Sequence, residues 1–123
     1  TLSQTVALDV VVKAKGPITG FMMHNIPGAV YGETISVAVK DKPITIMIAT
    51  TRYAICEIHQ FTDAGLNFDD YDVIVVKQGY IFPDFKAQAQ FYVMSLTDGA
   101  TPQDTASIPF KQIQRPMFPI DEI

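Results

Sequence analysis

The chain has 123 residues, which is the size of one domain with one hydrophobic core. Its formal net charge of −4 comes from carboxylates scattered along the chain, and no cluster of Lys and Arg suggests a face for nucleic-acid phosphates. The single cysteine, Cys56, excludes an internal disulfide and a cysteine-based zinc cluster, and no apolar run approaches the roughly 20 residues of a membrane span. We therefore expect a domain that binds neither nucleic acid nor membrane. We place it in the cytoplasm, where a lone thiol stays reduced.

The first strand is expected near the N-terminus. Residues 5–16 are rich in β-branched side chains and partly alternate in polarity, and Gly16-Pro17 gives a turn signal at their end. Residues 18–28 are apolar but are interrupted by a glycine and a proline. Irregular or edge structure is predicted for them.

A β-hairpin is the clearest pattern of the chain. It spans Ile35–Thr50, where two alternating runs flank Asp41-Lys42. The alternation predicts one half-buried face. Pro43 follows the turn at the first position of the second strand, where its missing N–H costs little.

After Arg52 the period changes from that of a strand to that of a helix. Residues 53–66 accommodate a short helix, and Gly65 stands where a C-terminal cap glycine is expected. Asp72–Lys77 then contains four consecutive apolar, β-branched residues. Such a run predicts a central strand with both faces covered.

A second helix is predicted from Pro83 to Leu96. Pro83 and Asp84 suit the first turn of a helix, and apolar residues recur at helical spacing as far as Leu96. The tail, residues 108–123, contains three prolines and is expected to be extended, with its apolar side chains packed. Together the elements predict a single α+β (or α/β) domain over residues 1–123: a mixed sheet with a hairpin, a central buried strand, and one or two packed helices.

The end of the strand at Lys77 is the first candidate site. In open α/β sheets, ligands bind beyond the carboxyl ends of the strands. The helix that begins at Pro83 would add unpaired N–H groups that favour an anion, and Lys77 would add a full positive charge. The alternative is that Lys77 only extends into water from the end of the sheet, while Gly79 makes the turn.

Other candidate residues are weaker. Arg52, at the end of the hairpin, suits either a carboxylate ligand or a surface ion pair. His59 and Asp63 are four residues apart and suit either a shared metal or a solvated helix face, whereas Glu57 and His59, two apart, are not expected to share a face. Cys56 is expected to be a buried thiol. No spacing typical of a zinc site, a calcium loop, a phosphate loop or a serine nucleophile is present, so no catalytic residue and no metal ligand is assigned.

Several pieces in a fixed order resemble one family. They are ITIMIATTR, FTDAGLNFDDYDVIVVKQGY, a helix, and IPFKQIQRPMFPID. This order is similar to that of the C-terminal domain of the MlrC family, zinc metallopeptidase-like proteins named for microcystin breakdown. Three motifs of the family have a counterpart here. Thr50–Arg52 matches its Thr-Ser-Arg, Val75–Lys77 matches its Val-Val-Lys, and Arg115–Asp121 matches its Arg-Pro-x-x-Pro-Leu-Asp. The similarity extends from about residue 35 to residue 121.

This resemblance implies a non-catalytic domain of a zinc hydrolase that acts on small or modified peptides. The zinc ligands of the family belong to its N-terminal domain, so the resemblance implies zinc in the parent protein and no cofactor in this chain. Lys77, Gln78 and Arg52 would face the substrate from one wall of the cleft. Many family members carry a Ser-Ser-x-His-Phe-like stretch after the lysine. Here Tyr80 would donate a hydrogen bond, and the acid–base role of the histidine is not carried over.

Two other functions stay open. One is a free-standing module that binds a small anion at the Lys77 loop. The other is a structural or dimerisation domain, in which the apolar tail around Met117-Phe118-Pro119 meets a partner. The expected partners are the domain's own N-terminal catalytic domain and a small peptide-like substrate, with a second copy of the chain as the alternative. Because the chain begins at Thr1 and not at a methionine, we expect it to be a piece of a longer protein.

Overall fold

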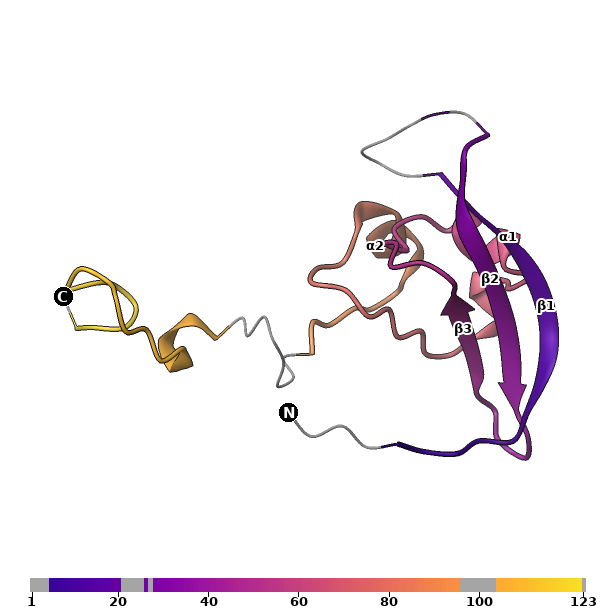
Figure 1. Ribbon diagram of the computed structural model, residues 1–123, viewed down its shortest axis with the longest axis horizontal. Coiled ribbons are helices and arrows are strands. Elements are labelled where there is room, and N and C mark those ends of the chain that lie inside the picture. Colours follow the sequence, from indigo (N-terminus) through magenta and orange to yellow (C-terminus); the bar gives the residue numbers. More distant parts are fainter. Residues whose placement is uncertain (1–4, 21–25, 27, 96–103, 123) are drawn as a thin grey trace. The chain divides into compact units, whose positions relative to one another are not determined.

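The computed structural model describes residues 5–20, 26, 28–95 and 104–122. The chain divides into two compact units, one formed by Val6–Tyr92 and the other by Val93–Ile123 with Thr1–Thr5. Figure 1 traces both units along the chain.

Three antiparallel strands in the order β1-β2-β3 form the sheet of the first unit (Figure 1). The strands are β1 (Val10–Thr19), β2 (Val30–Val39) and β3 (Thr45–Ala49). β2 is central and pairs with both neighbours. The predicted hairpin is therefore confirmed, with Asp41 at a φ of 59° in its turn. The second strand of the hairpin begins at Thr45, however, and not at Pro43 as predicted.

β1 continues through the Gly16-Pro17 signal at which it was predicted to end. Gly16 pairs with Thr34 and Pro17 pairs with Glu33, so both residues belong to the ladder with β2. β1 is an edge strand. A residue that lacks an N–H is tolerated there, because one side of the strand has no ladder to complete.

Small side chains on one face of the sheet allow α1 (His59–Asp63) to lie very close to it. Thr34 and Ser36 of β2 are completely buried on this face. The Ser36 hydroxyl donates a hydrogen bond of 2.6 Å to the carbonyl oxygen of Ala64, just after the helix. A Cβ atom added to Gly16 would lie 1.6 Å from the carbonyl oxygen of Asp63. The backbone of the helix end therefore packs directly on the backbone of β1.

α1 ends as the sequence predicts. Gly65 has a φ of +72°, a conformation that glycine adopts without strain. Its N–H donates to the Thr62 carbonyl oxygen at 2.9 Å, and the N–H of Leu66 donates to that of Phe61 at 2.8 Å. These two bonds form a Schellman motif, so the prediction of a capping glycine at position 65 is confirmed.

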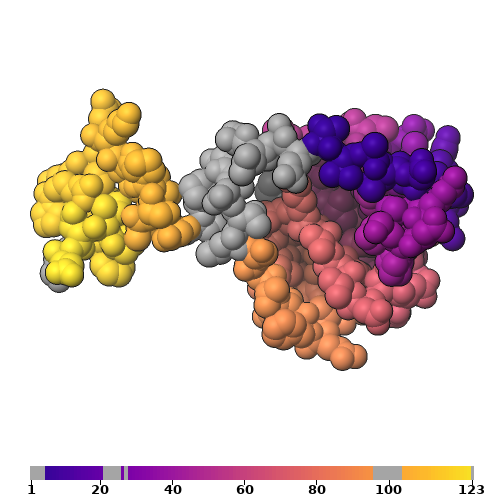
Figure 2. Space-filling model, turned by 90° about the horizontal axis from the view of Figure 1, so that it is seen from below, coloured from indigo at the N-terminus to yellow at the C-terminus, as the bar shows by residue number. Residues whose placement is uncertain are grey.

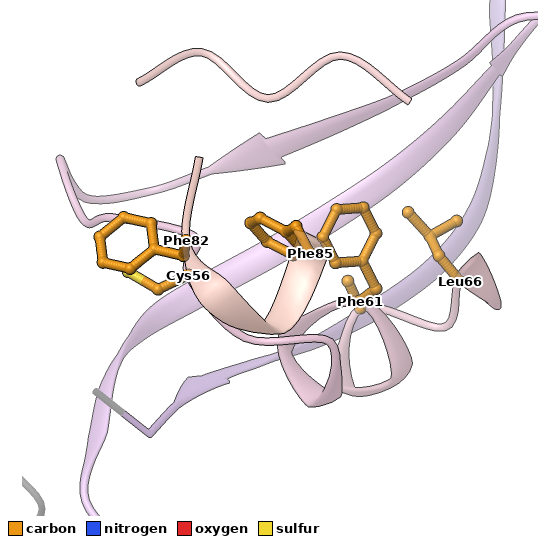
Figure 3. Packing of buried hydrophobic residues seen from close by; sticks show 6 residues of the cluster. Cys56, Phe61, Leu66, Phe82 and Phe85 are labelled. Atoms are coloured by element: carbon orange, nitrogen blue, oxygen red, sulfur yellow. The ribbon is translucent and has the colours of Figure 1, made fainter. Parts of the chain in front are cut away.

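The core of the first unit lies between the sheet, α1 and α2 (Pro83–Gln88). We call its buried residues the core cluster: Cys56, Phe61, Ala64, Leu66, Phe82 and Phe85. The rings of Phe61 and Phe85 meet edge to face with centroids 5.7 Å apart (Figure 3). Met47 of β3 packs against the same cluster, so α1 and α2 share one face of the sheet. An antiparallel sheet with two short helices on it confirms the α+β class.

α2 is shorter than predicted. It begins at Pro83, as expected, but it ends at Gln88, and Ala89 is already extended. Of its apolar stripe only Phe85 is buried, while Tyr92 and Val93 are exposed and Leu96 lies outside the described residues. Figure 2 shows the segment that follows α2, in orange, on the outside of the structure. A stripe that packs against nothing adds little to helix stability, which explains the early end.

Asp72–Lys77 was predicted as a central strand but joins no strand among the described residues. The segment is extended, with Ile74 and Val76 packed against the core cluster and Val73 and Val75 exposed. All strand pairings in the described part are antiparallel. The prediction of a mixed sheet with this central strand is therefore wrong for the described residues. An apolar run indicates that both faces need cover, and only one face has it here.

The second unit has a stretch of turns where an extended, packed tail was predicted. A 3₁₀ turn, Thr105–Ser107, precedes it. The Asp121 carboxylate accepts hydrogen bonds from the Arg115 guanidinium and, at 2.8 Å, from the N–H of Met117, which closes a loop over these residues. Phe118 is exposed on this loop, so the prediction that the tail packs fails at this residue. The carboxylate bonds explain why the segment turns and does not extend.

No helix in the described ranges combines the length and apolar character that crossing a membrane requires.

Gly16→Ala tests the close approach of α1 to the sheet. The added methyl would overlap the Asp63 carbonyl group, so we expect a loss in the free energy of unfolding at or above the upper end of the usual range of about 1–3 kcal/mol for overpacking. Gly79→Ala is the control, since its Cβ would meet no atom within 4 Å. Urea unfolding followed by circular dichroism measures both variants. Equal stability of the two would contradict this packing.

Candidate functional site

The loop that links the extended segment to α2 carries three of the four predicted site residues. Lys77 and Tyr80 are exposed there, and Gln78 is partly buried. The ring of Tyr80 lies 4.7 Å from that of Phe82, centroid to centroid, and Phe82 is buried in the core cluster. The loop therefore presents a cation and a phenol to solvent while its end is fixed by a buried phenylalanine.

The side-chain amide of Gln78 is an unusual feature of this loop. Both its oxygen and its nitrogen are shielded from solvent, and neither has a hydrogen-bond partner within the described residues. A shielded amide without a partner costs about 1–3 kcal/mol. This conformation is therefore disfavoured relative to one in which the amide meets a polar partner.

Arg52 is exposed on the segment that follows β3. The two preceding threonines hold the end of β3 against β2: the Thr50 hydroxyl accepts from the N–H of Glu33 at 2.9 Å, and the Thr51 hydroxyl donates to the Tyr31 carbonyl at 3.0 Å. Within the described residues no hydrogen bond or ion pair joins Arg52 to the Lys77 loop. The structure thus brings Lys77, Gln78 and Tyr80 together on one loop and places Arg52 on a different segment.

The beginning of α2 is poorly suited to an anion. The helix has only six residues, and its first turn contains Asp84. The Asp84 carboxylate accepts a hydrogen bond of 2.6 Å from the N–H of Ile58. A negative charge therefore already occupies the position at which an anionic ligand would benefit from the helix N-terminus.

Gln60 is the most connected polar side chain in the described residues, and sequence reasoning missed it. It is 1% exposed. Its carbonyl oxygen accepts from the N–H groups of Cys56 at 2.7 Å and Glu57 at 3.1 Å. Its nitrogen donates to the carbonyl oxygens of Thr19 at 3.3 Å and Ala54 at 3.4 Å. No sequence signal identifies this glutamine, because glutamine is common on the solvated side of helices.

His59 contacts Glu57, contrary to the prediction that the two would not share a face. Glu57 precedes the helix, so helical spacing does not apply to it, and its carboxylate lies 3.3 Å from Nδ1 of His59. Nε2 of the same ring lies 3.3 Å from the Thr19 carbonyl oxygen. Asp63, the other half of the suggested metal pair, instead accepts a hydrogen bond from the Thr19 hydroxyl. His59 and Asp63 are thus each engaged with other groups.

Among the residues that the structure describes, no three His, Cys, Asp or Glu side chains gather in a way that could hold a metal ion. An open cavity of about 540 Å³ lies beside His59 and is lined by Cys56, Glu57, His59, Pro83 and Asp84. Burial, and then the neighbouring Glu57 carboxylate, raise the pKa of the Cys56 thiol to about 11. The thiol therefore stays protonated at neutral pH and is no nucleophile, and the prediction of a buried thiol is confirmed.

Comparison with models of protein families identifies the family of the chain. The family described as MlrC C-terminus matches residues 2–112. The chain belongs to this family. No curated protein and no solved structure matches it.

The match to the MlrC C-terminus family includes the Lys77 loop and Arg52. It also includes the N-terminal residues, for which the sequence pieces gave no clear correspondence. It ends at residue 112, before the Arg115–Asp121 loop. Membership in the family therefore rests on residues 2–112, which include the whole first unit, and not on the closing arginine–proline motif.

Gln60→Leu tests the role of the buried amide in this MlrC domain. The substitution leaves the N–H groups of Cys56 and Glu57 without acceptors, so we expect the free energy of unfolding to fall by about 2–4 kcal/mol. Gln90→Leu, at an exposed position, is the matched control and should change it by less than about 0.5 kcal/mol. Chemical unfolding measures both. A loss below about 1 kcal/mol for Gln60→Leu would show that the four contacts are dispensable.

The raised pKa of Cys56 predicts a pH dependence of stability. The thiol keeps its proton in the folded chain up to about pH 11, whereas an unshifted thiol titrates near 9.0. Between these values the unfolded state loses the proton first, so the free energy of unfolding falls as pH rises from 9 to 11. Cys56→Ala lacks this group and should show a smaller fall over the same window. Identical pH profiles for the two proteins would refute the shift.

Proposed function

We propose that this MlrC C-terminal domain is a non-catalytic part of a larger zinc metallopeptidase-like hydrolase, and that its Lys77 loop forms one wall of the substrate cleft. The observation that supports this most directly is an exposed lysine on a loop whose end is anchored in the core by Phe82. A charge on an anchored loop holds a ligand with less loss of conformational freedom than a charge on a mobile one. Membership in the MlrC C-terminus family supports a parent protein of this kind.

The residues around the loop suit a peptide-like substrate with a carboxylate. Lys77 offers a positive charge, and Arg52 offers a planar guanidinium that binds carboxylates through two hydrogen bonds. Tyr80, 62% exposed, offers a hydroxyl donor. Gln78 takes part when its amide turns outward. Because that amide has no hydrogen-bond partner among the described residues, a substrate group that accepts its hydrogen bond offsets the cost of the movement.

In this proposal zinc and its ligands belong to the parent's N-terminal domain. The described residues of this chain contain no cluster that fits a metal ion. Zinc would polarise the bond to be cleaved, while the residues of this chain position the substrate. The small-anion module is less well supported, because Asp84 places a carboxylate in the first turn of α2.

Lys77→Ala and Arg52→Ala in the full-length gene product test the cleft wall. Each removes a charged hydrogen bond to substrate, worth about 1.5–3 kcal/mol, so we expect kcat/KM for a short peptide with a free carboxylate to fall about 10- to 100-fold. Lys42→Ala, in the exposed turn between β2 and β3, is the control and should leave the kinetics unchanged. Wild-type kinetics in both variants would rule out the cleft-wall role.

The size of the gene product tests the parent protein itself. Intact mass spectrometry of the native protein from cells should give a product several times longer than these 123 residues. A product of this length alone would exclude an accessory domain and leave a free-standing module.

A further inference from the structure

The segment Asp72–Lys77 has the side-chain arrangement of a strand that is covered on one side only. Ile74 and Val76 pack against the core cluster. Val73 and Val75 point the other way and are 78% and 88% exposed. β-branched residues favour extended structure most when they pack on a pleated surface, and here two of them face solvent. One side of the segment therefore has the cover that a strand needs, and the other lacks it.

The backbone of the same segment is also unpaired. Within the described residues, none of the N–H or C=O groups of Val73–Lys77 takes part in a backbone hydrogen bond, and the segment belongs to no ladder. Five successive residues thus offer donors and acceptors in an extended conformation. This is the arrangement to which a further strand adds.

Charges at the two ends of the segment restrict what such a strand can be. Three exposed aspartates, Asp69, Asp70 and Asp72, lie at its beginning, and Lys77 is exposed at its end. Neither Asp72 nor Lys77 belongs to an ion pair among the described residues. A complementary strand carries apolar side chains in its middle, a basic residue beside Asp72 and an acidic residue beside Lys77.

We infer that this strand is supplied by the part of the parent polypeptide that precedes the domain. The inference rests on the proposed function, in which a larger hydrolase contains the domain. A strand joined to the domain by a short flexible linker acts at an effective concentration of about millimolar, so a pairing of five or six residues suffices. A second copy of the chain would lose its translational freedom on pairing, and so small a contact does not offset that loss.

Pairing of the added strand with residues 73–77 also affects the candidate site. Lys77 is the last residue of the segment, and Gln78 follows it directly. A ladder between residues 73–77 and the added strand fixes the direction in which the Lys77 side chain points from this two-stranded pair. The added strand therefore positions the substrate-facing loop as well as joining the two parts of the protein.

Hydrogen exchange of the full-length gene product tests the inference. The amides of residues 73–77 that bond to the added strand should exchange at least about 100-fold more slowly there than in the 123-residue chain, because a ladder bond must open before exchange. Val75→Pro removes one backbone donor and disturbs its neighbours, so in the full-length protein it should return this segment to fast exchange. Val6→Pro, at another exposed position outside the strands, is the matched control and should leave the protection unchanged.

Val75→Pro also distinguishes a role of the segment in pairing with the added strand from a role in the folding of the 123-residue chain. Within the described residues the N–H of Val75 makes no backbone hydrogen bond, so Val75→Pro should leave the melting temperature of the 123-residue chain unchanged. A clear fall in that temperature would mean that the segment already has a structural partner within the chain. It would overturn the inference.

Three outcomes distinguish this inference from the proposed function. Fast exchange at residues 73–77 in a gene product that is longer than this chain overturns the shared strand and leaves the cleft-wall proposal standing. A gene product of only 123 residues overturns both. Protection that appears in the 123-residue chain as its concentration rises, with a dimer in light scattering, identifies a second copy as the occupant and overturns the inference.

Discussion

The carboxamide of Gln60 holds together three segments of the first unit. Its oxygen binds the backbone of residues 56 and 57, and its nitrogen binds the carbonyl oxygens of Thr19 and Ala54. It thereby joins the end of β1, the segment before α1, and α1 itself. A five-residue helix has little stability of its own. Its position depends on this amide and on the contact of its C-terminal end with β1 and β2.

The placement of α1 in turn determines where the candidate site lies. Phe61 of α1 packs against Phe85 of α2 (Figure 3). The N–H of Ile58 donates a hydrogen bond to the carboxylate of Asp84 at the start of α2. Phe82, one residue before α2, is buried in the same core cluster. The loop from Lys77 to Tyr80 is therefore attached at its C-terminal end to a group of aromatic side chains that the amide of Gln60 helps to fix.

Features that depend on neighbouring residues followed from the sequence, and features that depend on distant partners did not. The hairpin, the capping glycine at position 65 and the start of α2 at Pro83 are local, and each was predicted. The strand at Asp72–Lys77 and the second half of the predicted helix need a surface to pack on, and the described residues supply only part of it. For the same reason Gly16-Pro17, which is a turn signal in isolation, is part of an edge strand here.

The candidate site likewise has features that the sequence predicts and features that it does not. Lys77, Gln78 and Tyr80 lie on one loop because they are adjacent in the chain, which sequence alone indicates. The shielded amide of Gln78 and the network around Gln60 arise from packing between segments up to 41 residues apart, and no residue pattern reveals them. The substrate-binding roles of Lys77, Gln78, Tyr80 and Arg52 stay predictions, as do the zinc of the parent protein and its partners.

The small side chains of β2 that face α1 have a consequence for strand register. Thr34 and Ser36 face the helix, whereas Val37 and Val39 lie on the opposite face of the sheet. A slip of the strand by one residue would turn Ile35 and Val37 toward α1. At Gly16 that interface has no space for even one additional carbon atom. The native alignment already buries Val37 and Val39 on the opposite face, so burial of apolar groups and steric exclusion by the helix end both favour this alignment of β2.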